Sequence, residues 1–246
     1  MSHLSASPPP PPRPRLAGEC PTCGFPTDHP GGFLVLDLPV RHPNFGQLVQ
    51  CPTCNEGNLP ERLKAMSGLS GEMQEWTLAG FRWHKGRAAA IAGATAFIRT
   101  PIGWLTIWGE FGVGKTYFLA SIVNQCIQHR VAASYHVLPE LLRQLKAGYE
   151  DGSTDRLIDS LKSSSVLALD EVDKARGTSW ELATVFEILD WRYRNANQVG
   201  TVLAMNTDPR GDTSHPLAYV FSRMHDARFT ITEMGGGDVR PLMGER

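Results

Sequence analysis

The sequence predicts an α/β fold in which a mainly parallel sheet has helices on both of its faces. From residue 104 to residue 232, apolar runs of strand length alternate with longer segments whose apolar residues recur at helical spacing. The first of these runs leads into a glycine-rich turn and a patterned helix. Two later runs end in the polar residues Asp170 and Asn206, as is expected where parallel strands point at a ligand.

The order of these elements justifies a single sheet. The expected strands cover 104–108, 133–138, 165–169, 200–205 and 228–232. The expected helices cover 115–129, 139–148, 154–162 and 179–194, with a leading helix over 84–100 and a short helix that ends near 224. Because each strand is followed by a helix, consecutive strands are expected to be joined by crossovers and to run parallel.

Composition indicates how the chain is divided into segments, and composition and charge narrow the classes of protein to which it can belong. We expect a disordered Pro-rich arm over 1–17, a zinc-binding β module over 18–59, a connector with the leading helix over 60–100, the core over 101–234, and a tail over 235–246. Of the 246 residues, 41% are hydrophobic, which is enough for a packed core. The net charge of −1 gives the whole chain no basic footprint for nucleic acid. The longest apolar stretch is too short to span a bilayer and we recognise no secretory signal, so we expect a cytoplasmic protein.

The segment GEFGVGKT, from Gly109 to Thr116, fits the phosphate-loop pattern G-x-x-x-x-G-K-[ST]. Its glycines let successive backbone N–H groups face one anion, and the following helix adds its dipole. These glycines are Gly109, Gly112 and Gly114. Lys115 is expected to reach the β- and γ-phosphates, Thr116 to ligate Mg²⁺, and Tyr117 to lie beside the nucleotide. Cys126 falls on the apolar face of the helix and is expected in the core.

Asp170 and Glu171 end a buried-type strand, SSSVLALDEVDKA. An aspartate at such a strand end can hold Mg²⁺, and a second carboxylate can polarise an attacking water. The adjacent pair therefore favours hydrolysis over transfer to a substrate hydroxyl. The alternative is an ordinary strand followed by a solvated acidic turn, which is where we place Asp173.

Asn206 ends the apolar strand GTVLAMNTDP. Because the carboxyl ends of parallel strands converge on a ligand, its amide could contact the γ-phosphate or the lytic water. A turn-capping asparagine before Asp208 and Pro209 is the alternative.

Four segments resemble the AAA+ ATPases and, within them, the DnaC/DnaI/IstB-type group of helicase loaders and transposition helpers. They are GEFGVGKTYFLASIVNQC, VLALDEVD, FEILDWRYRNANQVGTVLAMNTDP and LAYVFSRMHDARFTI. The resemblance covers about residues 72–232. It implies an AAA+ core of the P-loop NTPase fold that binds ATP with Mg²⁺ and hydrolyses it. It also implies a reduced or absent lid, since only a short tail follows the last expected strand.

By its place in the resemblance, Arg223 is the arginine finger, which stabilises charge on the transferred phosphate, usually in a neighbouring subunit. That role implies a homo-oligomer when ATP is bound. A surface arginine in a local ion pair is the alternative reading of Arg223, and Arg192 and Arg228 are weaker candidates. Arg240 fits a solvated tail residue better than a second sensor arginine.

Cysteines pair in two Cys-Pro-Thr-Cys segments near the N-terminus, and each tight turn would point two thiolates at one Zn²⁺. The expected ligands are Cys20, Cys23, Cys51 and Cys54. A β-hairpin from strand-like runs over 32–40 and 47–50 would bring the pairs together, as in a zinc ribbon. A redox pair or unpaired thiols are the alternatives, and we interpret His29 and His42 as non-ligands. By resemblance to loaders with an N-terminal zinc domain, the module is expected to dock on a partner.

The leading functional prediction is an ATPase that loads a replicative helicase onto DNA, expected to be single-stranded. Within the family, the alternative is an IstB-like helper that serves a transposase. From other classes we consider an adaptor that binds ATP without turnover and a small-molecule kinase. The carboxylate pair argues against the adaptor, and the lack of an arginine-rich lid after the sheet argues against the kinase. Candidate DNA contacts are Arg82, His84, Lys85 and Arg87, interleaved with Phe81 and Trp83, unless this connector packs on the core.

Overall fold

The computed structural model of the chain describes residues 33–35, 42, 48–50, 52–81, 84–148, 152–175, 178–211 and 214–239. Side chains are described at residue 42 and from residue 59 onward. The chain divides into two compact units, Met1–Arg62 and Leu63–Arg246. In the described part of the chain, no helix combines the length and the apolar character needed to cross a bilayer.

The first unit contains a pair of short antiparallel strands. β1 (Phe33–Val35) and β2 (Leu48–Gln50) pair so that Leu34 lies opposite Val49. Both strands fall within the runs expected to form a hairpin. Helix α1 (Pro52–Met66) contains Pro52, Thr53 and Cys54 of the second Cys-Pro-Thr-Cys segment in its first turn.

The second unit is built on a five-stranded sheet with the strand order β4-β5-β6-β3-β7. Its strands are β3 (Gly103–Trp108), β4 (Ala133–Val137), β5 (Val166–Asp170), β6 (Gly200–Met205) and β7 (Thr230–Glu233). Every pairing between neighbours in this sheet is parallel. The predicted α/β fold with a parallel sheet is therefore confirmed.

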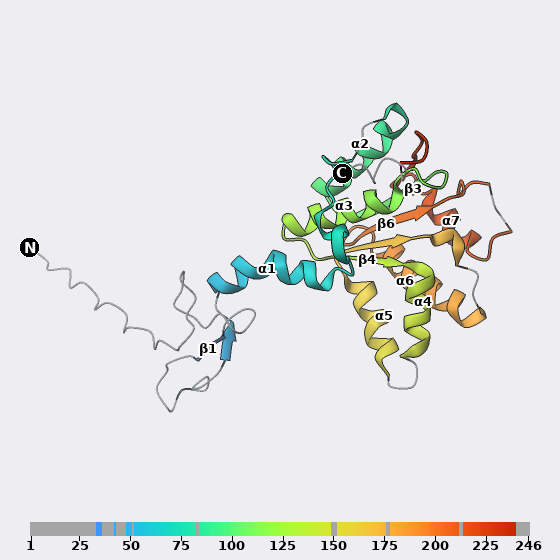
Figure 1. Cartoon of the computed structure of the whole chain (residues 1–246). Helices are drawn as coiled ribbons and strands as arrows, with labels where there is room; N and C mark the ends of the chain where they lie inside the picture. Colours follow the sequence, from blue (N-terminus) through green and yellow to red (C-terminus); the bar gives the residue numbers. More distant parts are fainter. Residues whose placement is uncertain are drawn as a thin grey trace, which may run out of the picture. The chain divides into compact units, whose positions relative to one another are not determined.

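Helices cover both faces of this sheet (Figure 1). They are α2 (Ala88–Arg99), α3 (Lys115–Gln128), α4 (Leu138–Ala147), α5 (Ser153–Ser163), α6 (Ser179–Arg194) and α7 (Ala218–Met224). Because successive strand residues point to opposite faces, Leu105 and Ile107 of β3 pack with α2 and α3, whereas Trp104 packs with α6 and α7. Residues of β5 and β6 alternate in the same way, so each face has its own apolar core.

The segment before the sheet packs on α3, the helix that follows the phosphate loop. It includes the short 3₁₀ turns η1 (Gly71–Glu75) and η2 (Lys85–Arg87), and a further 3₁₀ turn, η3 (Val172–Lys174), follows β5. The side-chain amide of Asn124 on α3 donates to the carbonyls of Met73 and Trp76, at 2.8 and 2.9 Å. Phe81 lies against Tyr117 and Phe118 of α3. This packing places the start of α3 between the sheet and the connector.

Candidate nucleotide-binding site

The phosphate loop joins the end of β3 to the start of α3 and is folded around the side chain of Lys115. Its Nζ donates to the carbonyls of Gly109, at 2.7 Å, and Glu110, at 2.8 Å. Gly114 is the N-cap of α3 in the left-handed region, with φ of +96°, and no side chain caps the helix. The first N–H groups of α3 therefore keep their capacity to bind an anion, which is the property that phosphate sites use.

Lys115 is buried, and this burial lowers the pKa of its ammonium group. The carboxylates of Asp170 and Asp173 oppose that effect and raise the pKa. A desolvated cation gains more from an anion brought next to it than a solvated one does. The loop is thus arranged so that a phosphate group completes the environment of Lys115.

Thr116 and Asp170 come together from different elements, the start of α3 and the end of β5. The Thr116 hydroxyl donates to Asp170 Oδ2 at 2.6 Å, and the N–H of Glu171 donates to Oδ1 at 2.8 Å. The hydroxyl of Tyr135 on β4 also donates to Oδ2, at 3.2 Å. Burial raises the pKa of Asp170, although these hydrogen bonds act against the rise. A hydroxyl and a carboxylate are oxygen ligands of the kind that Mg²⁺ prefers, so the predicted pair fits that ion.

Glu171 follows Asp170 in a strained backbone conformation. Its φ is +56°, in the left-handed region that non-glycine residues rarely adopt. Its carboxylate forms an ion pair with Lys174, whose Nζ lies 2.5 Å from Oε1. Both side chains remain partly exposed, so the pair is open to exchange with an incoming ligand.

Asn206 follows the end of β6 and is held by Asp173. Its main-chain N–H donates to Asp173 Oδ2 at 2.9 Å, and its side-chain Nδ2 lies 3.4 Å from Oδ1. Asp173 is therefore not the solvated residue that we expected, because its carboxylate joins the β5 turn to the β6 turn. The sequence offered no signal for this contact, since it depends on β5 and β6 being neighbours in the sheet.

These residues surround a cavity of about 320 Å³. Eight predicted site residues line it: Gly112, Gly114, Lys115, Thr116, Tyr117, Asp170, Glu171 and Asn206. The lining also includes four residues that were not predicted: Trp76, Phe111, Lys174 and Val239. Trp76 stacks on Tyr117 with ring centroids 4.8 Å apart, so Tyr117 presents an aromatic wall together with a residue of the connector. A large aromatic residue in the otherwise polar connector was a sequence signal that could have pointed to Trp76 as a site residue.

The start of the predicted tail lies against the phosphate loop. The N–H of Val239 donates to the carbonyl of Gly112 at 2.8 Å, and Arg87 donates to the carbonyls of Gly236 and Gly237, at 3.1 and 3.2 Å. Gly112 has φ of +79°, and a Cβ atom there would lie 2.3 Å from the Asp238 side chain. Asp238 and Val239 thus lie against the loop and Val239 lines the cavity, while Arg240 lies outside the described residues.

The three arginines considered as fingers have different surroundings. Arg223 on α7 forms an ion pair with Asp190 of α6 at 2.5 Å, and its guanidinium lies over the rings of Phe186 and Tyr193. Among the described residues that line the cavity, Arg223 is not present. A local ion pair was the alternative interpretation of Arg223, and the pair with Asp190 is of this kind.

Arg192 is excluded as a finger because it is fully buried. It donates to four main-chain carbonyls and one hydroxyl, those of Leu161, Lys162, Ser164, Gly200 and Thr201. Burial lowers its pKa to about 9. Arg228 is exposed and forms an ion pair with Asp226 at 2.7 Å. Arg192 therefore supports the core, and Arg228 remains a surface arginine.

Two of the four described connector residues that were predicted as DNA contacts are buried against the core. Phe81 and Arg87 are buried, and the Arg87 guanidinium lies 5.3 Å from the centre of the Phe81 ring. His84 and Lys85 are exposed, and His84 accepts from the N–H of Gly86. Arg82 and Trp83 lie outside the described residues. The alternative, a connector that packs on the core, is the correct one for Phe81 and Arg87.

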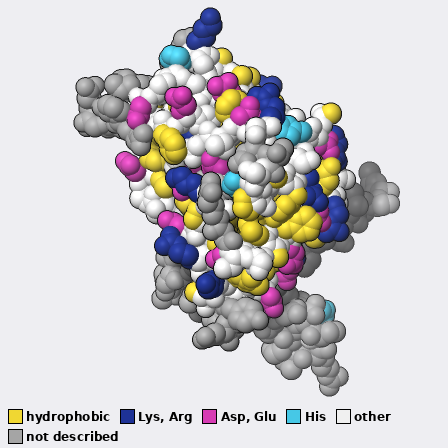
Figure 2. All heavy atoms as spheres, turned by 90° about the vertical axis from the view of Figure 1, so that its right-hand side faces the viewer, with side chains coloured by type: hydrophobic (Ala, Val, Ile, Leu, Met, Phe, Trp, Pro, Cys, Tyr) yellow, Lys and Arg dark blue, Asp and Glu magenta, His cyan; other side chains and the backbone are white. Residues whose placement is uncertain are grey.

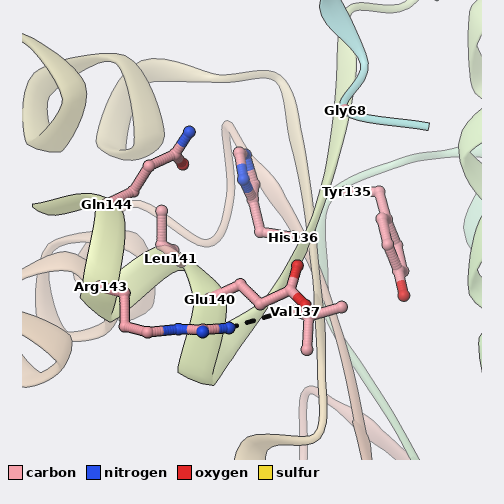
Figure 3. A pocket seen from close by; sticks show the side chains of 8 residues that line it. All are labelled: Gly68, Tyr135, His136, Val137, Glu140, Leu141, Arg143 and Gln144. Atoms are coloured by element: carbon pink, nitrogen blue, oxygen red, sulfur yellow. Dashed lines mark ion pairs between the residues drawn. The ribbon is translucent and has the colours of Figure 1, made fainter. Parts of the chain in front are cut away.

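A separate groove of about 560 Å³ lies beside β4 and α4 (Figure 3). Tyr135 and His136 point to opposite sides of β4, so Tyr135 reaches Asp170 while His136 lines the groove with Glu140 and Arg143. Burial lowers the pKa of His136. Glu140 and Arg143 form an exposed ion pair at 3.8 Å. The groove has a mixed polar and apolar lining and shares no lining residue with the phosphate-loop cavity.

The predicted zinc ligands are not tested by these contacts. Cys20, Cys23 and Cys51 lie outside the described residues, and Cys54 is described only by its place in α1. Where side chains are described, no group of three or more His, Cys, Asp or Glu residues is arranged to hold a metal ion. Cys126 is buried, as predicted, and burial raises the pKa of its thiol to about 12.

Part of the chain is similar to a replicative helicase loader and to a putative ATP-binding protein of an insertion sequence. The replicative helicase loader DnaI of Bacillus subtilis is 30% identical over 115 residues, which are 47% of this chain and 36% of that protein. A putative ATP-binding protein of insertion sequence IS1162 from Pseudomonas fluorescens is 30% identical over 122 residues, which are 47% of this chain and 53% of that protein.

The chain therefore spans between about a third and a half of the length of these relatives. The crystal structure of a DnaI matches with a TM-score of 0.59 and 27% identity, over 69% of this chain and 96% of that one. Residues 87–207, which contain the phosphate loop, Asp170, Glu171 and Asn206, match the family described as IstB-like ATP binding protein.

Proposed function

We propose that the chain is an ATPase of the IstB, DnaI and DnaC type that loads a replicative helicase onto DNA and uses ATP turnover to time the release of its partner. The observation that carries the ATPase part is the 2.6 Å contact between Thr116 and Asp170 beside the buried Lys115. With Glu171 and Asn206 on the same cavity, one chain supplies groups for binding phosphates and groups for activating water.

Each group has a task that follows from its chemistry. Lys115 and the first N–H groups of α3 bind the phosphates, and Thr116 with Asp170 would hold Mg²⁺. An ion held by these two residues would supply positive charge to the phosphate oxygens. Glu171 polarises the attacking water, which requires its carboxylate to leave Lys174. Asn206 hydrogen-bonds the γ-phosphate or that water. An adaptor that only holds ATP has no use for the last two groups.

Arg223 is proposed to act in the site of a second copy of the chain. Its cation lies on the surface formed by α6 and α7, next to the half-exposed ring of Phe186. Figure 2 views the side on which α7 lies in Figure 1 and shows hydrophobic side chains gathered with Lys and Arg side chains close by. Such a surface suits a protein interface. In that arrangement the phosphates of the neighbouring site replace Asp190 as the partner of Arg223.

The loader role is supported by the similarity to DnaI and by the four cysteines. We propose that Cys20, Cys23, Cys51 and Cys54 hold a structural zinc ion and that the module docks on the helicase. The matched IstB-like family and the IS1162 protein favour a second candidate, a helper ATPase for a transposase. Both roles use the same nucleotide chemistry, so only the partner separates them.

Three experiments test the proposal. Purified chain is expected to release phosphate from ATP in a Mg²⁺-dependent reaction, with and without single-stranded DNA, and an inactive wild-type chain would instead favour the adaptor. A pull-down with Glu171→Gln in the presence of ATP is expected to retain a ring helicase. Recovery of a transposase in its place would reject the loader in favour of the helper. Metal analysis that finds no zinc would reject the module.

A further inference from the structure

Asp173 is the centre of a hydrogen-bond cluster that connects three parts of the site. Its Oδ2 accepts from the main-chain N–H groups of Asn206, at 2.9 Å, and Thr207, at 3.2 Å. The Thr207 hydroxyl also lies 3.4 Å from Oδ2, and Asn206 Nδ2 lies 3.4 Å from Oδ1. Both oxygens of one carboxylate are therefore used to hold the residues that follow β6.

The main chain of Asp173 is fixed from the other side by His215. The carbonyl of Asp173 lies 2.9 Å from His215 Nε2, and His215 Nδ1 accepts from the N–H of Leu217 at 3.0 Å. Because Nδ1 is an acceptor, Nε2 carries the hydrogen and donates to Asp173. His215 is buried and stacks on Phe221 of α7, with ring centroids 4.8 Å apart. The cluster thus continues into the helix that carries Arg223.

We propose that Asp173 is a positioning residue, which fixes the Asn206 amide relative to Glu171 for the attack of water on the γ-phosphate. Asp173 stands two residues after Glu171 on η3, so a carboxylate that is bonded to Asn206 sets the distance between the two. One N–H of the Asn206 amide is held by Oδ1, and Asn206 lines the nucleotide cavity. This inference rests on the proposed hydrolysis.

Geometry in the adjoining space agrees with such a role. A second cavity of about 680 Å³ is lined by Phe111, Asp173, Lys174 and Asn206, among others, and it shares Phe111, Lys174 and Asn206 with the nucleotide cavity. The Asp173 cluster therefore lies where the two cavities meet. A simple turn cap for residues 206 and 207 is the competing explanation, and it requires no link to turnover.

The two explanations differ in a double-mutant cycle. If Asp173 acts through Asn206, then Asp173→Ala and Asn206→Ala each lower kcat at least about tenfold, and the double variant is no more than about twofold slower than the worse single variant. A turn cap predicts effects on kcat that multiply, or no effect at all. The Kd for ADP is expected to stay within about twofold in every variant, because ADP lacks the phosphate that Asn206 contacts. Asp159→Ala, an exposed carboxylate on α5, is the matched control.

Asp173→Asn keeps the test valid where the alanine variant fails to fold. An asparagine can accept from the two main-chain N–H groups, but its own NH₂ group would face Nδ2 of Asn206, and two donors cannot bond. The melting temperature is expected to stay near the wild-type value while kcat remains reduced at least about threefold. Wild-type kcat in Asp173→Asn, or multiplying effects in the cycle, would overturn the proposal.

A binding measurement separates this inference from the proposed function. If the wild-type chain binds ATP but releases no phosphate, hydrolysis is rejected, and Asp173 is then judged by the preference for ATP over ADP. Asp173→Ala and Asn206→Ala are expected to reduce the preference for ATP, measured as the Kd for ADP divided by the Kd for ATP, by the same factor. A ratio that changes in Asn206→Ala and not in Asp173→Ala would reject the positioning role.

Discussion

Replacing Lys115 with methionine removes one charge from the centre of the phosphate loop and keeps most of the side-chain volume. In the free chain, Nζ is bonded to two carbonyls of the loop, those of Gly109 and Glu110. The pKa of Lys115 is lowered by burial, so its ionised form costs the folded state free energy near neutral pH. Methionine removes that cost together with the two hydrogen bonds.

The expected effects on affinity and on stability are therefore very different in size. A hydrogen bond to a charged group contributes about 1.5–3 kcal/mol, and contacts to two phosphate oxygens would contribute about 3–6 kcal/mol. At 1.4 kcal/mol per factor of ten, the Kd for ATP rises about 10²- to 10⁴-fold. The two hydrogen bonds lost in the free protein also involve a charged group and cost about 1.5–3 kcal/mol each, but the desolvation penalty that is removed with the ammonium offsets much of this cost.

Isothermal titration with ATP and ADP measures the first effect, and thermal unfolding measures the second. Trp76 lines the cavity, so its fluorescence offers an independent reading of binding. Lys146→Met is the matched control, because Lys146 is exposed in the last turn of α4. A Kd for ATP within about threefold of wild type in a folded Lys115→Met protein would refute the assignment of the loop.

Three further variants test the remaining groups. Glu171→Gln is expected to bind ATP normally and to lower kcat at least about 10²-fold in a phosphate-release assay, and a smaller loss would remove its role as the base. Arg223→Ala is expected to lower kcat and leave the Kd for ATP unchanged; full turnover at high protein concentration would contradict the finger. Because burial raises the pKa of Asp170, the wild-type fold loses stability as pH rises from about 4 through that raised pKa. The difference in melting temperature, Asp170→Asn minus wild type, should therefore grow between pH 4 and pH 8, and a constant difference would argue against a desolvated carboxylate.

The strands, the helices and the loop could be predicted because each depends on a local pattern. Three local features are contiguous in the sequence: the apolar run before Gly109, the motif itself and the apolar face of α3. The backbone signals and the burial pattern therefore predict the same strand, loop and helix. Asp170 could be found for the same reason, since it directly follows a run of residues that are buried in β5. Local signals place these groups at the carboxyl edge of the sheet without knowledge of the strand order.

Contacts between distant segments could not be predicted in this way. Arg192 is charged and falls on a helix, yet it is fully buried and bonds to carbonyls at the C-terminal end of α5, directly after α5 and at the start of β6. Arg87 stands in a basic run and binds carbonyls of residues 236 and 237. Asp173 looks like any acidic turn residue until β6 is placed next to β5. In each case the partner residue is determined by the strand order or by the packing of residues 235–239. Composition and periodicity do not predict either of these.

In the proposed function, ATP binding and ATP turnover depend on different parts of the chain. Lys115, Thr116 and Asp170 lie close together within one chain. Arg223 of α7, in contrast, is paired with Asp190 of α6. If Arg223 serves a second copy, a single copy can bind ATP with full affinity but lacks the cation that speeds hydrolysis. The turnover rate per chain should then rise with protein concentration while the Kd for ATP stays constant. A rate per chain that is independent of concentration down to the limit of detection would place every catalytic group within one copy.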